Sequence, residues 1–164
     1  MAHYNVRIGI MNQQAWRDEL RKYFESVRII EKAKAETLES FDQFCEFIAE
    51  PAFDSLAGEM KEYGIKVRIR KEKGRAIHCD LSFPGSRIDN FHYRIVLPRN
   101  SIQLKLGLVL KGRRYKSAPL EEKTDDFMKG LAPAALIKLA KEDLIRDIIE
   151  RYKDFNLAAL TSAD

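Results

Sequence analysis

The sequence has few cysteines, few prolines and no long apolar run. Its 164 residues include two cysteines and five prolines. No apolar stretch approaches the ~20 residues that a membrane helix needs, so we expect no membrane association. The start of the chain also lacks the charged and apolar regions of a signal peptide. Two cysteines in such a chain are typical of free thiols in a reducing compartment, and we predict a cytoplasmic protein.

Charge is abundant but unevenly distributed. The net charge is only +4. Residues 61–116 carry 15 basic and 4 acidic side chains, a net charge of +11. Residues 1–60 carry 7 basic and 11 acidic side chains (−4), and residues 117–164 carry 7 and 10 (−3). A basic segment between two acidic ones indicates a surface for anions, with a nucleic-acid backbone as the obvious partner.

The first third of the sequence has the periodicity of helices. Apolar residues recur at steps of three and four from residue 13 to residue 49, which predicts a helix. The polar stretch 31–36 interrupts this pattern, so we expect a bend or break there. Pro51 suits the first turn of a further helix, and Gly64 suits its end.

After Gly64 the apolar period changes to two. Alternation predicts a four-stranded antiparallel meander within about 65–110, and leaves open whether 113–118 form a fifth strand. Helical periodicity returns from Pro133 to residue 155. The fold class is therefore α+β, a two-layer sandwich in which N-terminal and C-terminal helices cover one face of the sheet. We expect a helical arm at 1–34, the α+β domain at 35–156 and a frayed tail at 157–164.

The predicted outer face of the sheet holds most of the candidate binding residues. If buried residues of neighbouring strands lie opposite one another, the alternation predicts a row of Lys66, Asp80, Arg94 and Lys105 across the four strands. The same pairing places Arg68 opposite His78 and His92 opposite Ser82. Asp80 would then be a counter-ion among cations. One interpretation is a solvated face, and the other is a surface that binds anions or nucleic acid through Lys66, Arg68, Arg70, His78, Arg94 and Lys105.

No catalytic or metal site is predicted. Cys79 and His78 are neighbours on a strand, so they point to opposite faces and do not share a metal. Asp80 with Glu121 and Lys123 resembles the acid–acid–Lys layout of metal-dependent nucleases only loosely, because residues 119–126 are expected to form a loop and a helix start. No cofactor motif is present either.

The arm has a large apolar stripe for a segment set apart from the core. It either folds back onto the chain's own core or packs on another chain, and we expect a homo-oligomer, a dimer above all, or another protein partner. The function predicted is a non-enzymatic interaction protein. The alternative is a protein that binds nucleic-acid backbones without sequence preference. The candidate interface residues are Trp16, Leu20, Tyr23, Phe24, Val27 and Ile30.

Overall fold

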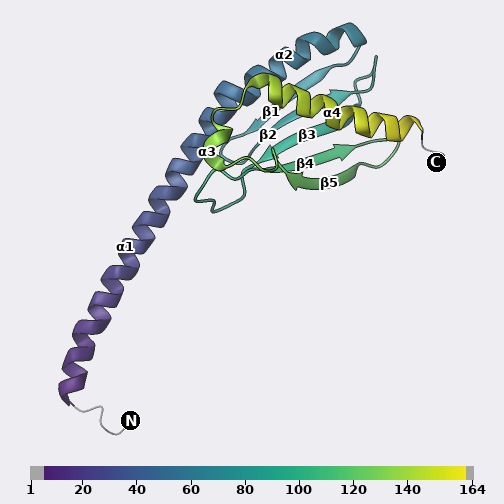
Figure 1. Cartoon of the computed structure of the whole chain (residues 1–164). Coiled ribbons are helices and arrows are strands. Elements are labelled where there is room, and N and C mark those ends of the chain that lie inside the picture. The colour runs from purple at the N-terminus through teal and green to yellow at the C-terminus, as the bar shows by residue number, and fades with distance from the viewer. Residues whose placement is uncertain (1–5, 162–164) are drawn as a thin grey trace.

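The computed structural model describes residues 6–161, with side chains from residue 13 onward, and has the expected α+β layout. Five antiparallel strands follow one another in the order in which they occur in the chain: β1 (Val67–Glu72), β2 (Ala76–Ser82), β3 (Asp89–Val96), β4 (Gly107–Gly112) and β5 (Glu121–Asp126). The long helix α1 (Val6–Phe44) precedes the sheet, and the short helix α3 (Pro133–Leu136) and helix α4 (Lys141–Leu160) follow it. Figure 1 shows this order along the colour gradient.

Helix α1 has no break at residues 31–36, so that expectation was wrong. The sequence "EKAKAE" lacks large apolar residues, but Ala, Glu and Lys are strong helix formers. Two ion pairs along the same turn, Lys34 with Glu31 and Lys32 with Glu36, add to its stability. The regular α-helix changes only later, at the π-helical turn Cys45–Ala49.

The π-helical turn leads directly into helix α2 (Glu50–Met60), which carries Pro51 in its first turn. Proline has no N–H to donate to the preceding turn, so this position accommodates a change of helical hydrogen bonding. The 3₁₀ turn Lys61–Tyr63 follows, and Gly64 ends the helical region with a φ of 70°. The expected roles of Pro51 and Gly64 are thus confirmed.

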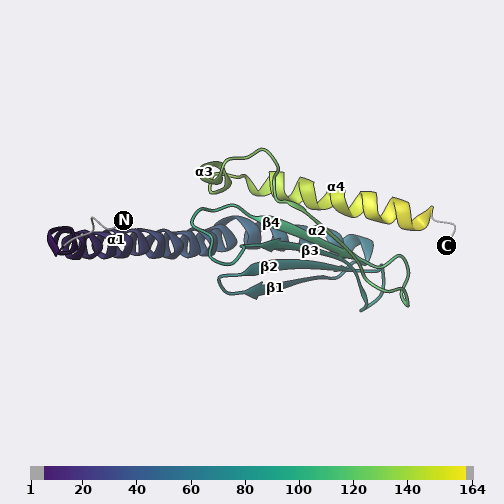
Figure 2. The same ribbon diagram turned by 90° about the horizontal axis from the view of Figure 1, so that it is seen from below.

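The core lies between the sheet and helices α2 and α4. Strands β2 and β3 contribute Cys79 and Tyr93, which are fully buried and directly opposite each other. The end of α1, together with α2 and α4, covers this face, and Figure 2 shows no helix on the other side of the sheet. Other fully or almost fully buried members of the core are Phe41, Phe44, Phe53, Ile77, Leu81, Phe91, Ile95, Leu144 and Ile148.

The sheet has one strand more than predicted. Strand β5 has the sequence "EEKTDD", with charged residues on both faces, so it lacks the apolar alternation that marks a half-buried strand. An edge strand with charged side chains is protected against pairing with other chains, which explains this composition. Strand β4 begins at Gly107, not near residue 102, because residues 102–106 do not pair with β3, although Leu104 and Leu106 are buried in the core.

The C-terminal helix also differs in its limits from the prediction. It begins at Lys141, after the short helix α3 that opens with Pro133. It continues to Leu160, so residues 157–160 of the expected tail are helical. Residues 162–164 of that tail, like the first five residues of the expected arm, lie outside the described residues. None of the described helices is long and apolar enough to cross a membrane.

Candidate functional site

The register of the sheet brings different residues together than the sequence predicted. Arg68 lies opposite Asp80, and Asp80 lies opposite His92. The sequence predicted Lys66 and Arg94 as the partners of Asp80. Each of these predictions was wrong, because the true partner lies two residues further along β1 or two residues earlier on β3. The first error arises because only three residues connect β1 to β2, around Gly74 with a φ of 71°, which shortens the turn that the prediction assumed.

The second row of the outer face was also mispredicted. His78 lies between Arg70 and Arg94, not opposite Arg68. Arg94 lies opposite Val109, because Lys105 belongs to the loop before β4. A bulge at the end of β2, between Leu81 and Ser82, shifts the β2–β3 register, an irregularity that apolar alternation does not show.

Asp80 is fully buried although it lies on the uncovered face of the sheet. Its Oδ1 accepts a hydrogen bond from His92 Nδ1 at 2.7 Å, and its Oδ2 accepts one from Arg70 Nε at 2.8 Å. Arg68 Nη2 lies 3.5 Å from the same Oδ2 and donates to Asp89 Oδ2 at 2.6 Å. The long side chains of the arginines can cover apolar and polar neighbours while their charged ends remain in water, which explains the burial.

The hydrogen bonds decide the charge of Asp80. Burial alone would raise the pKa of its carboxyl group, but the donors His92 and Arg70 hold that pKa below the ordinary value. The group is therefore ionised at neutral pH, as a structural anion should be. Its role as a counter-ion fits the prediction, although the cations around it are different ones.

His78 and Glu72 form the second half of this network. Arg70 donates to His78 Nδ1 at 3.2 Å, and His78 Nε2 lies 3.4 Å from Glu72 Oε2. Glu72 also accepts a hydrogen bond from Arg94 Nη2 at 3.0 Å. Burial lowers the pKa of His78, so this side chain is neutral at neutral pH.

Carboxylates on the same face of the sheet neutralise most of the positive charge of the candidate anion-binding surface. On β1–β3 the outer face carries three arginines, Arg68, Arg70 and Arg94, and all three pair with carboxylates. The three carboxylates are Asp80, Asp89 and Glu72. Lys66 is exposed beside this network, and Lys105 lies in the loop away from it. Asp89 and Glu72 were not predicted to belong to this face, since Glu72 is the last residue of β1 and Asp89 is the first residue of β3.

The same cluster contains the atoms of a conceivable metal site. Ligand atoms of Asp80, Asp89 and His92 all lie within 4.8 Å of one another. However, the two carboxylates already pair with arginines, whose positive charge opposes a cation at this place. The nuclease-like layout does not assemble. Glu121 and Lys123 lie on the helix-covered side of the sheet, three strands away from Asp80.

The arm is the second candidate site, and it does not fold back onto the domain. Figures 1 and 2 both show α1 leaving the domain at one end, with its N-terminal half apart from every other element. Tyr23 is 60% exposed and Trp16 is 47% exposed. Val27 is half-buried on the same stripe. The other large apolar side chains of the candidate interface, Leu20, Phe24 and Ile30, are exposed as well.

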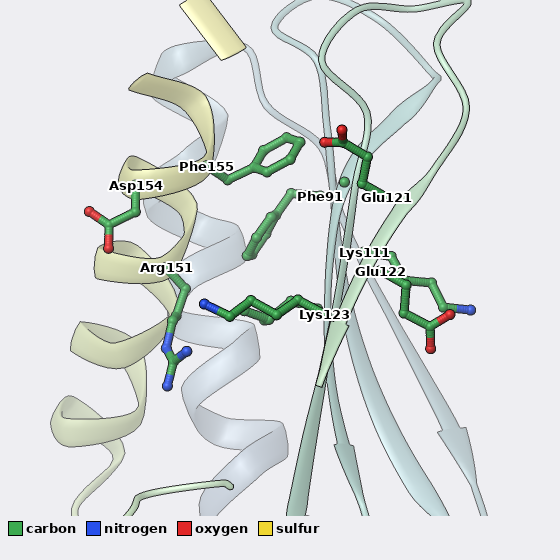
Figure 3. Close-up of a pocket in the computed structure, with 10 residues that line it drawn as sticks. Phe91, Lys111, Glu121, Glu122, Lys123, Arg151, Asp154 and Phe155 are labelled. Atoms are coloured by element: carbon green, nitrogen blue, oxygen red, sulfur yellow. The ribbon is translucent and has the colours of Figure 1, made fainter. Parts of the chain in front are cut away.

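A third candidate site is a cavity of about 280 Å³ between helix α4 and strands β4 and β5. Figure 3 shows Phe91 and Phe155 at one end of it, and Lys123 extending from β5 toward Arg151 on α4. This cavity could not be predicted from the sequence, because the residues that line it come from four separate segments of the chain, in β3, β4, β5 and α4.

Comparisons with known proteins did not identify a relative: no family model, curated protein or solved structure matched the chain. The function therefore has to be inferred from the geometry described above.

Proposed function

We propose that this protein is a non-catalytic interaction protein that pairs with a second copy of itself through its helical arm. The observation that carries the proposal is the exposed apolar stripe of α1, which includes Trp16 and Tyr23. Contiguous apolar surface of this kind on a monomer usually marks an interaction site. The domain covers none of it, so the alternative in which the arm packs on its own core loses its support.

The spacing of the stripe is that of a coiled coil. Five of the six candidate interface residues follow one another at alternating steps of four and three along the helix, an average period of 3.5 residues: Trp16, Leu20, Tyr23, Val27 and Ile30. Phe24 lies beside this seam. The same steps lead through Lys34 to Thr37, Phe41 and Phe44, which the chain's own domain buries. The seam is thus one continuous stripe that the domain covers at one end and leaves free over residues 13–33, about 30 Å of helix.

The position of the domain favours an antiparallel partner. Because the domain lies on the stripe side of α1 from Thr37 onward, two parallel copies would bring both domains into the same space between the helices. In an antiparallel pair centred on Tyr23, Trp16 lies near the partner's Ile30, and Leu20 lies near the partner's Val27. All five of these stripe residues then find apolar partners across the seam.

Charges beside the seam favour the same arrangement. Arg17 and Glu31 occupy equivalent flanking positions, each about two turns from the centre of the seam but on opposite sides of it. In the antiparallel pair Arg17 comes close to the partner's Glu31, and two-fold symmetry repeats this contact. A parallel pair would leave these two side chains without an opposite charge across the seam.

A pair of neighbouring isoleucines provides the test. Ile30 lies on the stripe, whereas Ile29 is 69% exposed and lies off it. We expect sedimentation velocity to show a dimer for the natural chain and for Ile29→Glu, and a monomer for Ile30→Glu. Removal of residues 1–32 should likewise give a folded monomer. A natural chain that remains monomeric at high micromolar concentration would disprove the proposal.

Binding of nucleic-acid backbones by the outer face is a weaker proposal. The three arginines that would contact phosphates are already paired with carboxylates. Only a polyanion that outcompetes these internal partners would bind, and its affinity should decrease steeply with salt.

A further inference from the structure

The cavity beside α4 lies where the helix passes the end of β4 and the start of β5. Gly112, the last residue of β4, contributes no side chain to fill this space. A Cβ atom at Gly112 would lie 2.2 Å from Cζ of Phe155, so the ring of Phe155 lies directly against the backbone there. The space left over is a cavity of about 280 Å³, close to the lower limit of small-molecule sites.

One wall of the cavity is aromatic. The rings of Phe91 and Phe155 lie 5.8 Å apart and are tilted by 40° to each other. Phe91 is almost fully buried and is also held by Tyr152 at 5.6 Å, while Phe155 is only half-buried. These rings offer a fixed apolar surface to a flat group.

The opposite wall is cationic. Lys123 lies in the row of Tyr93 and Leu110, so its side chain points to the α4 side of the sheet. Figure 3 shows its amino group directed toward Arg151, while Lys111 and Glu122 point to the other side of the sheet. Arg151 pairs with Asp125 at 3.0 Å and with Asp147 at 3.6 Å, but Lys123 has no ion pair with any residue of the described chain.

An exposed lysine on an edge strand would ordinarily be a solubilising residue. Here it instead reaches across an aromatic-lined cavity toward a second cation. Asp125 and Asp147 offset the charge of Arg151, whereas Lys123 has no ion-pair partner among the described residues. Asp154 points away from the cavity in Figure 3, so it does not offset the charge of Lys123.

We propose that this cavity binds a small anion that carries a flat apolar group, such as an aromatic carboxylate of roughly a dozen non-hydrogen atoms. The carboxylate would accept hydrogen bonds from Lys123 and Arg151, and the ring would contact Phe91 and Phe155. This site is independent of the arm, so the proposal goes beyond self-association and can fail or succeed separately from it.

The experiment compares a charged probe with a neutral one of the same shape. Binding of 2-naphthoate and 2-naphthamide to the full chain is measured by calorimetric titration. We expect naphthoate to bind about tenfold more tightly, because hydrogen bonds to charged groups are the stronger ones. Lys123→Gln should abolish this preference. Lys111→Gln, which removes a lysine directed to the other face, should retain it.

Two further variants locate the site. Gly112→Ala should weaken naphthoate binding at least tenfold, because the new methyl group displaces Phe155. The monomeric Ile30→Glu variant should bind naphthoate as the natural chain does. If the natural chain binds no naphthoate at low millimolar concentration, or if Lys123→Gln binds it equally well, the proposal is wrong.

Discussion

At the scale of single residues, Asp80 has the least expected environment. It is a carboxylate with no exposed surface on a sheet face that no helix covers. Hydrogen bonds from His92 and Arg70, not a covering element, satisfy it. A network of this kind is stable only when every member has its partner, because an unpaired polar group in such surroundings costs free energy.

We expect Asp80→Asn to lower the free energy of unfolding by about 3 kcal/mol, the lower end of the range for breaking a buried ion pair, since Arg68 and Arg70 can still reach water. Urea denaturation of the variant measures this change. Asp89→Asn is the matched control. It removes a carboxylate that, unlike Asp80, is partly exposed to solvent and pairs with Arg68 alone. This variant should lower the free energy of unfolding by less than ~1 kcal/mol. Equal effects of the two variants would contradict the central role of Asp80.

The two pKa shifts of the network predict how stability depends on pH. The pKa of His78 is lowered in the folded protein, mainly by burial and also by Arg70 and Arg94, although Glu72 and Asp80 act in the opposite direction. The folded state therefore binds fewer protons than the unfolded state as pH falls below about 6.5, the ordinary pKa of histidine, so stability decreases there. The pKa of Asp80 is also lowered, and its contribution is lost below about pH 4.

Urea denaturation between pH 8 and about pH 3 tests this dependence. We expect His78→Gln to flatten the loss of stability just below pH 6.5, and to leave the steep loss below pH 4. An unchanged profile in the His78→Gln variant would show that other groups cause the first decline.

Residue alternation predicted correctly which side chains of β1–β3 share the outer face, because the side chains of a strand point alternately to its two sides. It wrongly placed Lys105 on that face, since Lys105 lies in the loop before β4. It did not predict which residues lie opposite one another. That depends on the length of the turn at Gly74 and on the bulge before Ser82, and neither changes the apolar pattern. The contact between Asp80 and His92 could therefore not be predicted from the sequence, although both residues were correctly assigned to the outer face.

At the scale of elements, the pattern of apolar residues predicted the helices and strands that contribute side chains to the core. The helices and the strands that pack on them were evident from their periods of 3.6 and 2. Strand β5 was not, because an edge strand without a buried face has no such pattern. The continuous helix across residues 31–36 was missed for a related reason: helix propensity alone maintains it where packing is absent.

Lys34 interrupts the seam of α1 between Ile30 and Thr37. Its side chain is 30% exposed and pairs with Glu31. If the seam pairs with a second copy, Lys34→Leu should strengthen the dimer by about 1 kcal/mol, roughly fivefold in dissociation constant, since apolar surface is buried in place of a charge. Sedimentation equilibrium measures the constant. Lys32→Leu, at a position that is 80% exposed and off the seam, should leave it unchanged. A weaker dimer in Lys34→Leu would show that the partner does not lie on this stripe.

At the scale of the whole molecule, the chain is a domain with a helix that projects from one end (Figure 1). The acidic charge of residues 1–60 and the basic charge of residues 61–116 do not form two opposed surfaces, since ion pairs such as Lys71 with Asp42 and Glu50 join them within the domain. The positive charge of the sheet surface is therefore smaller than the uneven distribution of charge along the sequence predicted. The feature that remains for association is the arm.

The orientation of the two arms gives the last prediction. In an antiparallel dimer Arg17 lies near the partner's Glu31, whereas in a parallel dimer the two positions are about 20 Å apart along the helices. Chains with the single change Arg17→Cys and chains with the single change Glu31→Cys are prepared separately, mixed and oxidised mildly. The natural thiols should not interfere. Cys45 and Cys79 are fully buried, and burial raises the pKa of Cys45 to about 12 and that of Cys79 further still. We expect a disulfide-linked dimer only in the mixture, because each cysteine then finds the other across the seam. Linked dimers in either unmixed sample would indicate parallel arms, and the domains would then have to lie side by side at one end of the molecule.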